Sequence, residues 1–163
     1  MLRRYRTWTA LVVGLVLAAG CNNSAKLLST AEFSTQYGAA SDGFTSSMAA
    51  VQNDARTAVQ SQSSESEARV FASMQNITEE TLAKMRPLRP PSKYADDLSA
   101  VRSALTAQRD ALKRVLSAAK AANDADMNAA LQSYATALTT WQASAARLDT
   151  SLGRAPARAG PPA

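Results

Sequence analysis

The sequence contains no histidine and a single cysteine among its 163 residues. Zinc fingers, CxxC redox centres, haem-attachment motifs and histidine-based catalytic sites therefore lack the groups they need. Aromatic residues are also scarce, at 6% of the chain. Alanine, in contrast, occupies 35 positions, which favours closely packed helices over a sheet built from β-branched residues. Length and composition together predict one all-α domain of ordinary size.

The first residues are organised like an export signal. A basic segment from Arg3 to Arg6 precedes an apolar run from Ala10 to Gly20, which is too short to span the ~30 Å hydrocarbon core as a permanent helix. The run ends in Leu-Ala-Ala-Gly-Cys at Cys21, which resembles the lipobox of bacterial lipoprotein precursors, although Ala18 stands where that family more often has leucine. The resemblance implies that residues 1–20 are a signal peptide and that the Cys21 thiol carries a thioether-linked diacylglycerol.

Two other outcomes are compatible with the same residues. The ordinary secretory peptidase would leave a free thiol at Cys21, and an uncleaved leader would itself anchor the chain. Acylation would remove an unpaired, oxidisable thiol from an exported protein, and two or three acyl chains hold a protein far more firmly than one. We therefore expect lipid attachment through Cys21 to the outer face of the cytoplasmic membrane or to the outer membrane.

The net charge of +5 does not indicate a nucleic-acid binder. Removal of the signal peptide leaves 15 basic against 13 acidic residues, and residues 28–152 carry 12 basic against 13 acidic. A protein that binds DNA or RNA needs a basic face with several phosphate contacts, and export places this chain on the other side of the membrane. We expect no nucleic-acid partner.

Apolar residues recur at spacings of three and four, which predicts helices at about 29–60, 65–86, 92–122 and 124–152. The heptad-like register and short connections predict an antiparallel up-down-up-down four-helix bundle made of two long helical hairpins. Residues 21–28 are then the acylated cysteine with a short tether, 29–153 the bundle, and 154–163 a disordered tail. The thin aromatic core also indicates possible self-association along exposed seams.

Several local signals set the expected helix ends. Ser29 and Glu32 have the spacing of a capping box, Asn123 or Asp124 is suited to cap the last helix, and Gly153 is suited to end it. The prolines of 87–91 interrupt the helical pattern between the two hairpins. One weak point is Asp42-Gly43, where two poor helix formers predict a kink or a break.

The acidic residues do not form a recognisable catalytic or metal site. Asp124, Asp126 and Asn128 resemble the start of a calcium loop, but the glycine and the final glutamate of that loop are replaced by alanines. The pairs Glu79-Glu80 and Asp96-Asp97 lack the histidines of a di-metal bundle. We therefore predict no catalytic residue, no metal and no cofactor.

Four residues form a candidate ligand pocket. Tyr37, Tyr134 and Trp141 combine apolar rings with polar ends, as small-molecule sites do. Gln108 interrupts the apolar register of its helix, where a polar residue either fixes helix register, lies at an exposed edge or contacts a ligand. Aromatic residues at helical spacing are also typical of an ordinary core, so the pocket is one of two interpretations.

The anchor and the lack of catalytic groups predict an envelope lipoprotein with a structural or accessory role, acting through an unidentified protein partner. The main alternative is a carrier or chaperone-like bundle that holds an apolar molecule or a client. Receptor blocking by a surface lipoprotein is a third hypothesis, which no residue favours. An enzyme using serine, lysine or carboxylate chemistry is a fourth, for which no nucleophile-and-base spacing stands out.

Overall fold

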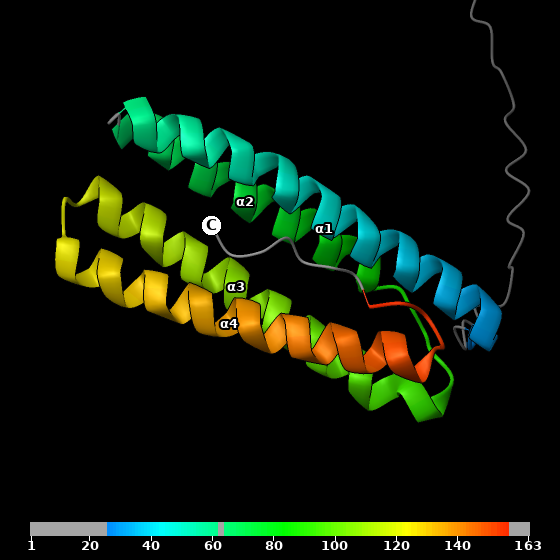
Figure 1. Ribbon diagram of the computed structural model, residues 1–163. Helices are drawn as coiled ribbons and strands as arrows, with labels where there is room; N and C mark the ends of the chain where they lie inside the picture. The colour runs from blue at the N-terminus through cyan, green and yellow to red at the C-terminus, as the bar shows by residue number, and fades with distance from the viewer. Residues whose placement is uncertain (1–25, 62–63, 157–163) are drawn as a thin grey trace, which may run out of the picture.

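The computed structural model describes residues 26–61 and 64–156, and four long helices account for most of them (Figure 1). The helices are α1 (Thr30–Ser61), α2 (Ser64–Met85), α3 (Ala95–Lys120) and α4 (Asp124–Ser151), with a short 3₁₀ turn, η1 (Ser92–Tyr94), before α3. The predicted all-α four-helix bundle is confirmed, and these ranges contain no strand. No helix within them has both the length and the apolar character needed to cross a bilayer.

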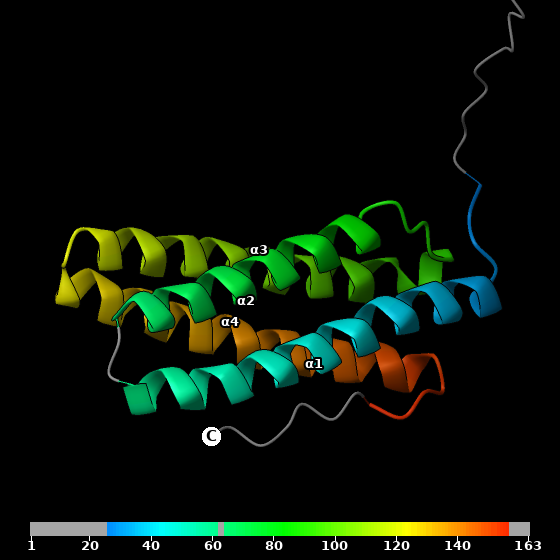
Figure 2. The same ribbon diagram turned by 90° about the horizontal axis from the view of Figure 1, so that it is seen from above.

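The bundle consists of two antiparallel hairpins, α1–α2 and α3–α4, laid against each other (Figures 1 and 2). Helices α3 and α4 pack closely because the residues along their seam are small, and Ala104, Ala137 and Ser144 are buried there. Helices α1 and α4 instead meet through large side chains. The rings of Phe44 and Trp141 pack edge to face with their centroids 4.6 Å apart.

The caps predicted from the sequence are present at two helix starts. The Ser29 amide donates to Glu32 Oε2 at 2.8 Å, and the Glu32 amide donates to Ser29 Oγ at 3.2 Å. These bonds form a complete capping box, and the hydrogen bonds from Ser29 lower the pKa of Glu32. At the start of α4 the Asn123 side chain accepts a hydrogen bond from the Asp126 amide.

The ends of α3 and α4 have the same backbone form. Gly153 follows α4 with φ 69°, and Ala122 follows α3 with φ 50°. The Arg154 amide donates to the Asp149 carbonyl at 2.8 Å, and the Asn123 amide donates to the Ala118 carbonyl at 3.0 Å. Both turns are Schellman motifs, which end a helix with a left-handed residue. Glycine was predicted for this role after α4, whereas after α3 the role falls to an alanine.

Helix α1 continues without a break through Asp42 and Gly43. The predicted weak point does not interrupt it because Ala40 and Phe44, on either side, are buried in the core. Burying a phenylalanine contributes about 1.5–3 kcal/mol, which exceeds the roughly 1 kcal/mol lost by placing glycine in a helix.

The core is best packed where α1 begins and α4 ends. Phe33 stacks on Tyr37 and on Tyr94, with ring centroids 5.9 and 5.8 Å apart. Helix α3 buries nine residues, whereas α2 buries four, all of them between Thr78 and Met85. The apolar residues in the first part of α2 are therefore only half-buried; these are Val70, Phe71, Met74 and Ile77.

The link between the two hairpins is fixed by an arginine. Nη2 of Arg102, on α3, donates to the carbonyl oxygens of Met85, Arg86 and Leu88. Met85 and Arg86 lie at the end of α2, where carbonyls lack the usual helical donors, and Leu88 lies in the link; the Met85 carbonyl also accepts from the Leu88 amide at 3.1 Å. The Leu28 amide, before α1, donates to the Arg89 carbonyl at 2.8 Å. Leu28, the link and the start of α3 therefore lie at one end of the bundle.

Candidate functional site

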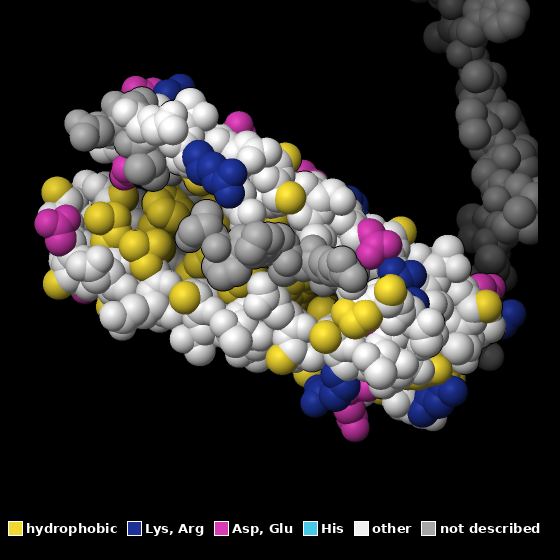
Figure 3. Space-filling model, viewed as in Figure 1, with side chains coloured by type: hydrophobic (Ala, Val, Ile, Leu, Met, Phe, Trp, Pro, Cys, Tyr) yellow, Lys and Arg dark blue, Asp and Glu magenta, His cyan; other side chains and the backbone are white. Residues whose placement is uncertain are grey.

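A groove lies between α1 and α4. Its volume is about 270 Å³, and Phe44, Met48, Tyr134, Leu138 and Trp141 provide its apolar surface. Figure 3 shows apolar side chains gathered in the hollow between the two hairpins. The groove exists because α1 and α4 are held apart by aromatic rings, whereas the small residues of α3 and α4 let those helices close on each other.

The two aromatic residues of α4 in this groove differ in their burial and in their contacts. Tyr134 is half-buried, and burial raises the pKa of its hydroxyl. Trp141 is 2% exposed, and its indole Nε1 has no hydrogen-bond partner among the described residues. The indole is fixed by its contact with Phe44. The groove thus has a rigid apolar floor and a phenol at its side.

The structure places two of the four predicted pocket residues together and the other two elsewhere. Tyr134 and Trp141 both line the groove. Tyr37 is fully buried against Phe33, near the beginning of α1. Gln108 is fully buried on α3 and does not line the groove. Phe44 and Met48 complete the groove; their spacing on α1 is that of ordinary core residues, so no sequence signal marked them as pocket residues.

Gln108 is an unusual core residue. It occupies a register position between Leu105 and Leu112, which are also fully buried. Neither its amide oxygen nor its amide nitrogen has a hydrogen-bond partner within the described ranges. A buried amide without partners costs about 1–3 kcal/mol by protein mutational data. Gln108 therefore lowers stability, which is the usual cost of a polar residue that sets helix register.

A cluster of three charged side chains, Arg154, Asp149 and Asp42, lies where α1 passes the end of α4. Nε of Arg154 donates to Asp149 Oδ1 at 3.1 Å, and its Nη2 donates to Asp42 Oδ2 at 3.0 Å. Asp149 is 1% exposed, whereas the Asp42 side chain is 60% exposed. Burial by itself would lower the pKa of Arg154, but the hydrogen bonds to both carboxylates have the larger combined effect, so the pKa is raised.

Gly38 makes room for this arginine. A Cβ at position 38 would lie only 2.7 Å from Arg154 Nη2 and closer still to the rest of the guanidinium. The Tyr37 hydroxyl faces Ser41 nearby, but neither hydroxyl reaches a partner at hydrogen-bond distance. Burial, with a further contribution from Asp149, raises the pKa of Tyr37. Arg154, which the sequence analysis placed in the tail, is thus held by the folded bundle.

A wide furrow along the outer side of α3 and α4 has a volume of about 1140 Å³. Its lining is dominated by alanine, serine and threonine. Charged side chains occur only at its rim, at Asp110, Lys113 and Arg114. Small side chains supply neither an apolar anchor nor a converging set of polar groups, so the smaller aromatic groove is the better candidate site.

The acidic pairs of the sequence take part in surface ion pairs. Glu79 contacts Lys113 at 3.3 Å, and Asp97 contacts Arg147 at 2.7 Å. Hydrogen bonds from Gln75 and Lys113 lower the pKa of Glu79. No group of three or more potential metal ligands occurs in the described part of the chain.

The predicted lipidation site, Cys21, lies outside the described residues, as do the signal peptide and residues 157–163. Comparison of the chain with protein-family models, with curated proteins and with solved structures finds no match.

Proposed function

We propose that this protein is a lipid-anchored accessory component of a bacterial envelope and that its bundle acts by contact with another protein. The lipobox-like sequence ending at Cys21 supports the anchor. The groove between α1 and α4 supports the contact, and its apolar lining along two helices is the observation that carries the proposal. The role is non-catalytic, and turnover of a substrate by the pure protein would overturn this part.

The shape and lining of the groove favour protein side chains as its occupants. Its volume of about 270 Å³ is close to the lower end of the roughly 300–1,000 Å³ of sites for drug-sized molecules. It lies between two antiparallel helices and has a rigid apolar floor of Phe44 and Trp141. Such a surface suits the apolar face of a partner helix, which inserts side chains one turn apart into a groove.

Site-specific photo-crosslinking in cells tests this proposal. A crosslinkable residue replaces Gln142, which lines the groove, or Gln132, an exposed glutamine on the outer furrow of the same helix. We expect a crosslink to one discrete protein from position 142 and none from position 132. The same crosslink in a Cys21→Ser background should weaken, because the unanchored chain no longer shares the surface of its partner. Equal labelling from both positions would contradict the proposal.

A second candidate function is supported by the unpartnered polar atoms of the core. Gln108 and Trp141 together leave three buried nitrogen and oxygen atoms without partners. A carrier that opens along the seam between α1 and α4 would offer these atoms to a polar group on an otherwise apolar ligand. Native mass spectrometry of the protein purified from its host distinguishes the two functions, since a carrier retains extra mass and an interaction module does not.

A further inference from the structure

Exposed basic side chains gather at the end of the bundle where α1 begins. Lys26 precedes α1, Arg86 and Arg89 lie in the link after α2, and Lys93 lies in η1; all four are exposed. Figure 3 shows Lys and Arg side chains projecting around this end. We call these four residues the basic end.

The fold holds the basic end together although its residues come from three segments. The hydrogen bond from the Leu28 amide to the Arg89 carbonyl joins the tether to the link. Nζ of Lys93 lies 4.7 Å from the centre of the Tyr94 ring, and that ring packs on Phe33 of α1. The four charges therefore occupy one surface with a fixed backbone.

The four charges are not held in ion pairs with neighbouring carboxylates, although Lys26 is close enough to Glu32 to help the hydrogen bonds from Ser29 lower the pKa of that carboxyl. None of the four makes an ion pair within the ranges that the structure describes. The acidic residues nearest in the fold are Glu32, which accepts a hydrogen bond from Ser29, Asp97, which is paired with Arg147, and Asp96.

The helix ends at the opposite end of the bundle carry mostly carboxylates. The first turns of α2 and α4 contain four and the last turn of α3 contains one lysine; these residues are Glu65, Glu67, Asp124, Asp126 and Lys120, and Glu65 is ion-paired with Arg69. Basic and acidic residues are therefore unevenly distributed between the two ends of the bundle, although the whole folded region is close to neutral.

The basic end is also the end closest to the predicted anchor. Lys26 follows Cys21 by five residues, which span at most about 18 Å when fully extended. Helix α1 has 32 residues and is therefore about 48 Å long. An acylated Cys21 would bring the basic end to the bilayer surface and leave the acidic end a helix length away. Next to Lys26, Leu27 is 60% exposed and is the exposed large apolar residue of the bundle.

We propose that the basic end is a docking surface for the anionic headgroups of phospholipids and that it sets the bundle upright on the membrane. This inference rests on the proposed function, which places a lipid anchor at Cys21. The charge pattern by itself predicts attraction to an anionic surface, because each lysine or arginine near such a surface raises the partition coefficient about fivefold. Leu27 would enter the headgroup layer beside Lys26.

Vesicle flotation of the chain from residue 22 onward tests the docking surface without the acyl anchor. This piece contains every core residue of the bundle, from Phe33 to Leu148, and circular dichroism checks its fold. We expect binding to phosphatidylcholine vesicles containing phosphatidylglycerol, and weaker binding to pure phosphatidylcholine. The double variant Arg86→Gln/Arg89→Gln should lower the partition coefficient on anionic vesicles by about 25-fold.

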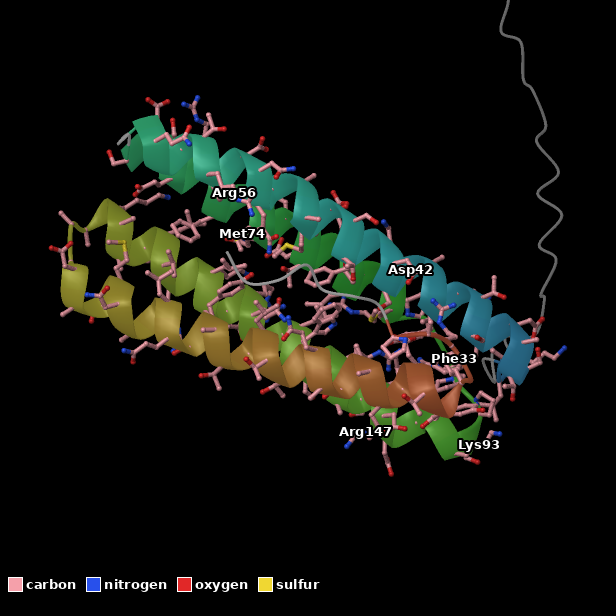
Figure 4. The ribbon with its side chains drawn as sticks, viewed as in Figure 1. Phe33, Asp42, Arg56, Met74, Lys93 and Arg147 are labelled. Atoms are coloured by element: carbon pink, nitrogen blue, oxygen red, sulfur yellow. The ribbon has the colours of Figure 1, made fainter. Side chains whose placement is uncertain are left out.

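A matched variant removes two charges from elsewhere on the bundle. Arg56→Gln/Lys120→Gln changes the net charge equally, and both residues are exposed and far from the basic end. Figure 4 shows Arg56 and Lys93 towards opposite ends of the molecule. This pair should leave vesicle binding within about twofold. Equal losses in both variants, equal binding to neutral and anionic vesicles, or no binding to either would overturn the docking surface. The crosslinking experiment above would be unaffected, so the two proposals fail separately.

Discussion

Gly38→Ala is expected to destabilise the bundle even though alanine is the better helix former. Position 38 lies inside α1 and is buried under the guanidinium of Arg154. The added Cβ would occupy the space of that guanidinium, so Arg154 must withdraw. Its hydrogen bonds to Asp149 and Asp42 would then be lost.

The size of the effect follows from two opposing contributions. Alanine is favoured over glycine in a helix interior by about 1 kcal/mol. A hydrogen bond between charged groups contributes about 1.5–3 kcal/mol, and the bond to Asp149 falls in this range because that carboxylate is buried. The bond to exposed Asp42 adds little. A loss of about 2 kcal/mol against a gain of about 1 leaves Gly38→Ala roughly 1 kcal/mol less stable.

The sign of the effect should reverse when the arginine is absent. In an Arg154→Ala background the three atoms nearest to the new methyl group are absent, and Gly38→Ala should stabilise by about 1 kcal/mol. The double-mutant cycle therefore has a coupling free energy of about 2 kcal/mol. Gly43→Ala is the control, since a Cβ there meets no atom within 4 Å and should stabilise both backgrounds equally. Urea unfolding followed by circular dichroism measures all of these values. If Gly38→Ala stabilises both backgrounds alike, the proposed role of Arg154 is wrong.

Three further predictions concern single features of the core and its caps. Ala122→Gly should stabilise by up to about 1 kcal/mol in urea unfolding, because it relieves a left-handed alanine; the same change at right-handed Ala121 should give no gain. Gln108→Met should stabilise by about 1–2 kcal/mol by removing a buried amide without partners; destabilisation would mean that the native protein supplies a partner. Burial raises the pKa of Tyr37 and Tyr134, so the stability they contribute below their unfolded pKa of about 10 should fall as the pH rises above it. Phenylalanine at both positions should reduce that alkaline loss of the free energy of unfolding, and an unchanged pH profile would contradict this account.

Local sequence patterns were sufficient to predict the helices and most of their ends. The capping box at Ser29 and the glycine at position 153 act over three to five residues, and such interactions are readable from spacing alone. The spacing of apolar residues on α3 was equally clear from Leu98 to Val115, where the positions of the stripe are buried, whereas Ala119 and Ala122, at the same spacing, are exposed. These signals fix the fold class because four amphipathic helices with short links have few ways to pack.

Features that depend on how the helices face one another were not predictable. Arg154 and Asp42 are 112 residues apart, so no spacing rule joins them. Thr78 was not assigned to the core, yet it is fully buried because its hydroxyl donates to the Met74 carbonyl of its own helix. Periodicity placed Tyr37 and Tyr134 on inward faces of their helices. It did not show that, of the two, Tyr134 lines the groove between α1 and α4, because the groove depends on the sizes of side chains on neighbouring helices.

The uneven burial along α2 has a consequence for how the native bundle opens. Only the last two turns of this helix contribute fully buried residues, while the aromatic stack of Phe33, Tyr37 and Tyr94 and the Arg102 bonds to the link all lie at the same end. Amide hydrogens in the first half of α2 should therefore exchange with solvent through small, frequent openings, and those of α3 only through global unfolding. Proteases should likewise cut first within the first half of α2.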